Sequence, residues 1–209
     1  MVSPQMALTA AHCVRANWDT SDPNLTVKLS DGEVYGIKEF RTNECWDFSS
    51  GLPYSADIAI MILDRPIPNA QEFVHYIPTW NAETMDDVVG REFELAGWGA
   101  SGSVNDEGDW DESHTRSEIF HRGYNVVNAI VNNMLVYTMD RPEDGGLPLE
   151  SMGHYGDSGS GALLFEPDGT VDSDGFPNGK RWIIGVKSNG GPAQWGTSHQ
   201  YTRVGGYHW

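Results

Sequence analysis

Short runs of β-branched, aromatic and other apolar residues recur along the chain, and turns rich in Gly, Pro, Asn and Asp separate them. Runs of this length and spacing are typical of β-strands. Patterns with helical periodicity are scarce, and residues 125–131 are ambiguous between a helix and a strand. The chain is therefore predicted to be all-β, an antiparallel barrel or sandwich. Strands are predicted at 25–30, 33–41, 57–63, 91–99, 133–139, 161–165, 181–188 and 200–204.

A proline-bearing stretch at 65–80 interrupts this succession of strands and is predicted to link two halves. Residues 1–80 would form the N-terminal half and residues 81–209 the C-terminal half. A length of 209 residues suits one all-β domain of two packed halves, or two small domains. No internal repeat and no low-complexity tract is present.

The charge balance limits the classes of partner. Thirteen basic residues against 30 acidic ones give a net charge of −17, which repels nucleic acid and anionic membrane surfaces. No apolar run approaches the roughly 18 residues needed to span a bilayer. The acidic runs at 105–112 and 167–175 lack the ligand pattern of a calcium-binding loop, and the two cysteines lack zinc-site spacing. We therefore expect solvated acidic loops, no metal and no cofactor.

Three polar residues stand out by their local sequences. His12 ends the apolar run of LTAAHC, Asp57 begins the apolar run DIAIMIL, and Ser158 lies in the glycine-rich GDSGSG. Taken singly, each is typical of a structural histidine, a turn at the start of a strand, or a polar turn. Taken together, they supply a general base, a carboxylate that orients the base, and a hydroxyl to be activated.

Five motifs occur in a recognisable order: LTAAHC (8–13), DIAIMIL (57–63), LAGWG (95–99), GDSGSG (156–161) and YTRV (201–204). With these motifs the chain resembles the chymotrypsin-like serine proteases of the trypsin family over nearly its whole length. The resemblance implies two six-stranded antiparallel β-barrels with the catalytic groups in the cleft between them. It also implies a serine endopeptidase that acts on polypeptides, is secreted and monomeric, and is subject to proteinaceous inhibitors.

The resemblance assigns roles to the residues of these motifs. Ser158 would be the nucleophile, His12 the general base and Asp57 the carboxylate that orients it, with an acyl-enzyme as the intermediate. The backbone N–H groups of Gly156 and Ser158 would form the oxyanion hole.

The resemblance also places a substrate-binding strand and a specificity pocket. Ser188 and Gly190 would pair with an extended substrate, and Met152 would lie at the base of the pocket. Lys187 and His199 would lie at the pocket wall. Two preferences for the residue before the cut remain open. A cationic, narrowed pocket would select an acidic side chain. If Lys187 and His199 point outward, the pocket would accept mid-sized apolar side chains.

Several features depart from the family pattern. Few residues precede Ala10, so the first barrel is expected to be incomplete and the chain to be trimmed at its N-terminus. The residues that would hold the usual partners of Asp157 and Cys13 are then missing, and we expect Asp157 to lack a partner and Cys13 to form a disulfide with Cys45.

A non-catalytic homologue that acts as a binding or regulatory module is the alternative function. Such relatives usually lack a triad residue, and none is lacking here. A serine esterase of the α/β-hydrolase class is excluded because the histidine comes first in the chain and no βαβ pattern surrounds Ser158.

Overall fold

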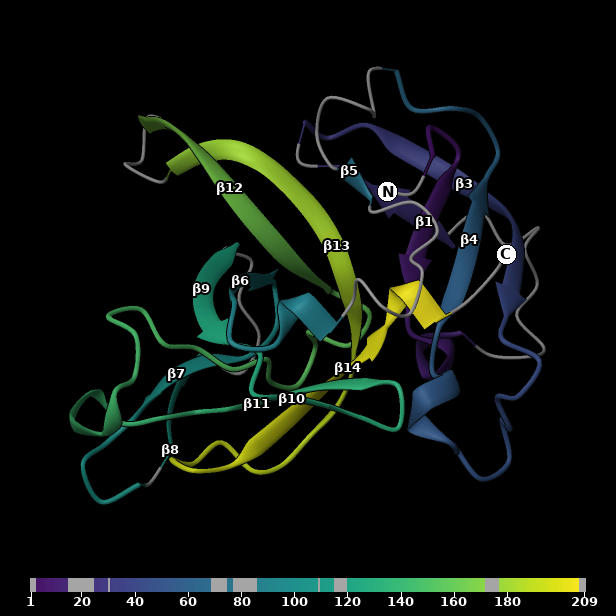
Figure 1. Ribbon diagram of the computed structural model, residues 1–209. Helices are drawn as coiled ribbons and strands as arrows, with labels where there is room; N and C mark the ends of the chain where they lie inside the picture. The colour runs from purple at the N-terminus through teal and green to yellow at the C-terminus, as the bar shows by residue number, and fades with distance from the viewer. Residues whose placement is uncertain are drawn as a thin grey trace.

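The fold consists of β-sheets joined by turns and short 3₁₀ segments (Figure 1). The computed structural model describes residues 3–14, 25–29, 31–68, 75–76, 86–108, 110–114, 120–171 and 177–206. Within these ranges it contains no α-helix, and no helical segment is long and apolar enough to cross a membrane. Two curled antiparallel sheets dominate, as the chymotrypsin-like two-barrel prediction requires.

The first sheet has four strands in the order β1-β4-β3-β2. They are β1 (Met6–Thr9), β4 (Ala59–Leu63), β3 (Val34–Thr42) and β2 (Thr26–Lys28). The apolar strand β4 lies in the interior of this sheet, between β1 and β3, where Ala59 and Leu63 are fully buried. A continuous apolar run suits that position because both of its faces are covered.

The second sheet has eight strands and contains the long β12–β13 hairpin, which arches over the molecule in Figure 1. Its order is β10-β11-β14-β13-β12-β6-β9, with β5 pairing in parallel with β13, and a separate hairpin joins β7 to β8. The strands are β5 (His75–Tyr76), β6 (Glu92–Gly97), β7 (Ser101–Val104), β8 (Trp110–His114), β9 (His121–Val126), β10 (Ala129–Val131), β11 (Met134–Thr138), β12 (Gly161–Val171), β13 (Pro177–Gly190) and β14 (Ser198–Arg203).

The largest core cluster lies inside the second sheet. Phe93 packs edge-on against Tyr137 and Tyr201, with ring centroids 5.3 and 5.8 Å apart. Edge-to-face pairs of this kind add about 0.5–1.5 kcal/mol beyond the burial of their surface. Strands β6, β11 and β14 are therefore held together by three interlocked aromatic rings.

The eight predicted strands are all present, with ends shifted by a few residues. The ambiguous segment 125–131 is resolved as strand, since it contains the end of β9 and all of β10. The pattern missed the short strands β1, β5, β7 and β8 and most of β9, because each is too short or has too few apolar residues in alternation to be distinguished from a loop. Residues 75–76 of the predicted linker pair with β13 of the second sheet.

The expected disulfide between Cys13 and Cys45 is not formed, and both residues are free cysteines. Cys13 follows β1 and packs against the buried cluster of Ala10, Ile58 and Val186. Cys45 is exposed in the turn after β3. The two thiols therefore belong to different environments, one between the sheets and one at the surface.

A buried ion pair connects the middle of the second sheet. Glu94 on β6 is 2% exposed and accepts three bonds of 2.9–3.2 Å from the Nε and Nη2 atoms of Arg181 on β13. Both oxygens of the carboxylate are engaged, which satisfies the buried charge of Glu94.

Glu94→Gln is expected to lower the free energy of unfolding by about 3 kcal/mol, because it removes the charged carboxylate that accepts three bonds from Arg181. Chemical denaturation would measure the loss. Glu92→Gln is the matched control, since Glu92 lies on the same strand but is exposed. Equal effects of the two substitutions would contradict the assignment.

Candidate active site

His12 and Asp57 meet because two paired strands bring them together. β1 and β4 are antiparallel, with Thr9 opposite Ala59. His12 lies in the 3₁₀ turn just after β1, and Asp57 precedes β4 by two residues. His12 Nδ1 lies 2.6 Å from Asp57 Oδ2, and the backbone N–H of His12 donates to Asp57 Oδ1 at 2.8 Å. The carboxylate therefore fixes both the ring and the backbone of His12.

The second sheet completes the surroundings of Asp57. Ser188 at the end of β13 donates its hydroxyl to Asp57 Oδ2 at 2.6 Å. Thr202 on β14 donates to the backbone carbonyls of Tyr54 and Asp57, at 2.9 and 3.2 Å. Asp57 is fully buried, so the bonds from His12 and Ser188 replace the water that its carboxylate loses. Sequence reasoning placed Ser188 on the substrate strand and missed its bond to Asp57.

The electrostatics of the pair favour a charged imidazole. The hydrogen bond to Asp57 raises the pKa of His12 well above its ordinary value of 6.5, and the Cys13 side chain adds to this against the opposing effect of burial. The His12 side chain is 35% exposed, so its ring reaches solvent while its partner does not. Asp57 thus stabilises the protonated ring that forms when His12 accepts a proton.

Ser158 lies on an exposed turn whose shape depends on glycine. Gly156 and Gly159 have φ values of +93° and +85°, which L side chains rarely adopt. A Cβ on Gly159 would meet the Thr9 side chain and the Ala10 nitrogen, so the turn presses against the end of β1. The Gly159 N–H donates to the Lys187 carbonyl at 2.9 Å. The contacts of Gly159 therefore place the turn that carries Ser158 beside the end of β1 and beside Lys187.

The two backbone N–H groups that are predicted to form the oxyanion hole lie in the same turn. Among the described residues, no hydrogen-bond partner is recorded for the backbone N–H groups of Gly156 and Ser158, so both are available as donors. Asp157 between them has partners, contrary to expectation. Gly99 and His154 each donate a backbone N–H to its carboxylate at 2.9 Å. A Cβ on Gly97 or Gly99 would overlap this carboxylate, so the GWG motif provides the space that Asp157 fills.

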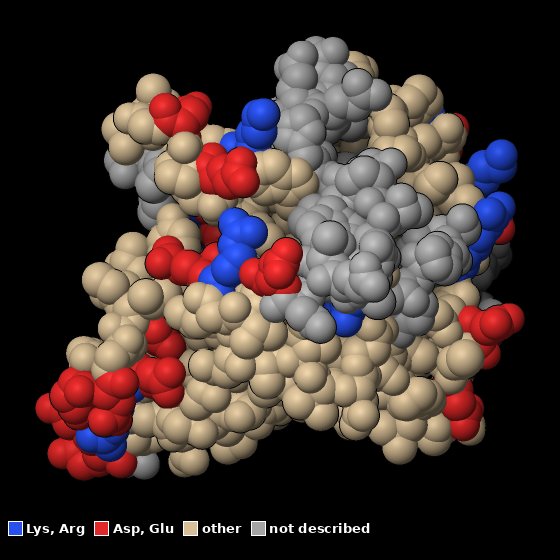
Figure 2. Space-filling model, in the orientation of Figure 1, with Lys and Arg blue, Asp and Glu red and all other residues tan. Residues whose placement is uncertain are grey.

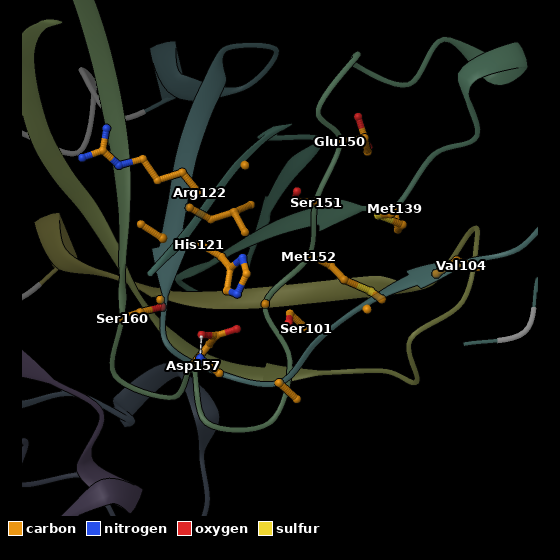
Figure 3. A pocket seen from close by; sticks show the side chains of 18 of the residues that line it. Ser101, Val104, His121, Arg122, Met139, Glu150, Ser151, Met152, Asp157 and Ser160 are labelled. Carbon is orange, nitrogen blue, oxygen red and sulfur yellow. Dashed lines mark hydrogen bonds between the residues drawn. The ribbon is translucent and has the colours of Figure 1, made fainter. Parts of the chain in front are cut away.

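Two hollows adjoin this turn. A cavity of about 350 Å³ lies beside Asp157, and His121, Met152 and Ser160 are among the residues around it (Figure 3). Met152 therefore lines this cavity and also packs against the main core cluster. A second hollow of about 380 Å³ includes Ser158 itself, with Leu8, Trp98, Phe120, Leu163 and Val186 among its mostly apolar walls.

Lys187 and His199 both point inward, with exposed fractions of 4% and 1%. The Lys187 ammonium donates to the Asn189 carbonyl at 2.9 Å and lies 3.4 Å from the Tyr137 hydroxyl and 3.5 Å from His199 Nδ1. A Cβ on Gly153 would crowd the Lys187 side chain, and one on Gly190 would overlap the His199 ring. The outward orientation that an apolar pocket requires is therefore not the one observed.

Burial governs the protonation of this pair. It lowers the pKa of Lys187 from 10.5 to about 7, against a smaller opposing effect of Asp157. It also lowers the pKa of His199 to about 3, with the Lys187 and His154 charges adding to the effect. Tyr137, which sequence reasoning did not single out, contributes a hydroxyl and an aromatic face 5.4 Å from the ammonium. No sequence motif identifies Tyr137, because its surroundings in the sequence are those of an ordinary strand residue.

The family model described as Trypsin matches residues 1–207, which is almost the whole chain. No curated protein matches the chain.

The His12–Asp57 pair makes a prediction that requires no substrate. The His12 ring should titrate well above 6.5 by NMR, and Asp57→Asn should move this pKa back toward 6.5 by removing the charged acceptor. Asp47→Asn is the control, since Asp47 is an exposed acid in the same half of the chain. A wild-type His12 that titrates near 6.5 would contradict the strong hydrogen bond.

The burial of Lys187 predicts a pH-dependent cost in stability. Below pH 7 the folded protein carries a buried ammonium, whereas between pH 7 and 10.5 it binds fewer protons than the unfolded chain. The contribution of Lys187 to the stability of the wild type therefore rises with pH in that window. Relative to wild type, Lys187→Met should be more stabilising at pH 6 than at pH 9, by about 2–3 kcal/mol at 1.36 kcal/mol per pKa unit.

Paired denaturation curves at the two pH values would measure this difference. Lys180→Met controls for the loss of one positive charge, since Lys180 is exposed on the same strand. A Lys187→Met effect that is independent of pH would show that the ammonium is not buried as described.

Proposed function

Because the chain belongs to the trypsin family, we propose that it is a serine endopeptidase that cleaves polypeptides through an acyl-enzyme on Ser158. The observation that carries this proposal is the hydrogen-bonded chain from Ser188 through Asp57 to His12, at 2.6 Å for each side-chain link. A carboxylate that is buried and bonded in this way holds the histidine ring in one tautomer, with Nε2 left for the nucleophile.

The reaction would follow from these positions. Ser158 Oγ attacks the carbonyl carbon of the peptide bond while Nε2 of the neutral form of His12 accepts the hydroxyl proton. The developing oxyanion accepts hydrogen bonds from the Gly156 and Ser158 amides. When the C–N bond breaks, His12 returns the proton to the leaving amine. A water molecule then attacks the acyl-enzyme, again with His12 as base, and releases the acid product and Ser158.

The alternative of a non-catalytic homologue lacks support. The chain contains all three triad residues, His12, Asp57 and Ser158. The backbone N–H groups of Gly156 and Ser158 donate to no other group among the described residues. Binding modules derived from proteases need none of these features.

The side chain accepted before the cut would be determined by Lys187 and His199 at the pocket wall. Ser188 and Gly190 of the substrate-binding strand would lie next to them. We take an acidic side chain as the preferred residue at this position. The burial of Lys187 and His199 supports this choice over a mid-sized apolar residue, since the apolar pocket requires both side chains to point outward.

Ser158→Ala should abolish labelling by a fluorophosphonate probe and lower kcat on peptide substrates by roughly 10⁴- to 10⁶-fold. Mass spectrometry of the labelled protein would locate the modified serine, and peptide hydrolysis would measure kcat. Ser160→Ala, two residues along the same turn, is the matched control and should retain labelling at Ser158. Labelling that persists in Ser158→Ala and moves to another serine would overturn the assignment.

A further inference from the structure

We propose that Lys187 selects a substrate carboxylate at the residue before the cut, and that it does so only while its side chain is protonated. This inference rests on the proposed endopeptidase function. It adds a substrate class and a proton-controlled specificity to that site.

The first support is an ammonium without a charged partner. Lys187 Nζ contacts a carbonyl, a phenol hydroxyl and an imidazole nitrogen, all of them neutral groups. Among the described residues, none of the ion pairs includes Lys187. A buried charge is costly unless it is paired, and a ligand carboxylate would supply the missing partner.

The second support is the position of Lys187 relative to the nucleophile. Its carbonyl accepts the Gly159 N–H, one residue from Ser158, and its own N–H donates to the Ser160 carbonyl at 2.8 Å. The next residue, Ser188, binds Asp57. The ammonium therefore projects from the backbone segment that adjoins both the nucleophile and the triad carboxylate. An acyl group held on Ser158 would have its nearest side chain beside this segment.

The third support is that Gly153 and Gly190 leave room for the Lys187 and His199 side chains. Gly153 abuts the Lys187 side chain and Gly190 abuts the His199 ring, in each case closer than any Cβ would permit. The polar groups beside these glycines are an ammonium and an imidazole. A carboxylate fits this chemistry, whereas an apolar side chain would leave the ammonium without a charged partner.

The charged and titratable groups around the ammonium come from several elements. His199 and Tyr201 lie on β14 and Tyr137 on β11, and burial keeps all three neutral near pH 7 by lowering the pKa of the first and raising that of the two phenols. Asp157 and His154 lie in the loop that leads to Ser158, and the Asp157 carboxylate accepts hydrogen bonds from two backbone N–H groups. The charge of Lys187 itself changes near neutrality, since its pKa lies at about 7.

The test compares two peptide substrates that differ only in Glu or Gln before the cut. The ratio of their kcat/KM values cancels the titration of His12, because both substrates use the same triad. The ratio should exceed about 10 at pH 6 and fall toward 1 by pH 9, with its midpoint near 7. Below pH 5 it should fall again as the substrate carboxyl group gains a proton.

Two variants separate Lys187 from the rest of the pocket. Lys187→Met should bring the Glu/Gln ratio to about 1 at every pH, whereas Lys187→Arg should keep a ratio above 1 at pH 9, because a guanidinium stays charged. Lys180→Met should leave the wild-type ratio profile unchanged and so controls for net charge. Phosphonate labelling of Ser158 in each variant reports that the triad is assembled.

Several results would overturn the inference. They are a wild-type ratio near 1 at pH 6, a ratio that does not change between pH 6 and 9, and a ratio that survives Lys187→Met. Best cleavage after Leu, Phe or Met would also overturn it. If Lys187→Met does not fold, the wild-type profile and Lys187→Arg decide. Absence of Ser158 labelling together with absence of peptide cleavage would instead reject the endopeptidase function itself.

Discussion

The buried carboxylate of Asp57 is the point on which the two sheets and the proposed chemistry depend. Its oxygens accept hydrogen bonds from the His12 backbone and ring in the first half of the chain, and from Ser188 in the second half. Thr202 fixes the adjoining turn from β14. A carboxylate with no exposed surface needs all of these donors. The requirement to satisfy one charge therefore determines how the His12 turn meets the end of β13.

The turn around Ser158 illustrates a second constraint, which is close backbone approach. Asp157 fits only because Gly97 and Gly99 lack side chains, and the Gly156 and Gly159 conformations turn the chain sharply on either side of Ser158. The carboxylate of Asp157 takes the amides of Gly99 and His154, which leaves those of Gly156 and Ser158 without a partner. The Gly156 and Ser158 amides are therefore free at an exposed turn because Asp157 is bonded to other amides.

Much of this arrangement could be predicted from sequence because it depends on local pattern. The strands follow from apolar runs and turn residues, and His12, Asp57 and Ser158 each lie in a distinctive motif. The partners of Asp157 could not be predicted, since they are backbone amides that no residue type identifies. The same holds for Tyr137 near Lys187, because a strand tyrosine is ordinary until the sheet places it. The Cys13–Cys45 pairing failed because the thiols lie in different surroundings, which spacing alone does not reveal.

The charge of the whole molecule and the charge of the pocket act at different ranges. Most charged atoms on the face in Figure 2 are acidic, and they gather at the corner where Figure 1 places β7, β8 and the turn containing Glu143 and Asp144. With a net charge of −17, this surface repels an acidic peptide at a distance, but dissolved salt screens exposed charges over about 10 Å at 0.1 M. Lys187 is buried, so salt weakens its attraction for a carboxylate far less. Selection for an acidic side chain would therefore be exerted at contact and not during approach, and it would be most effective in salty surroundings, where the surface no longer opposes it.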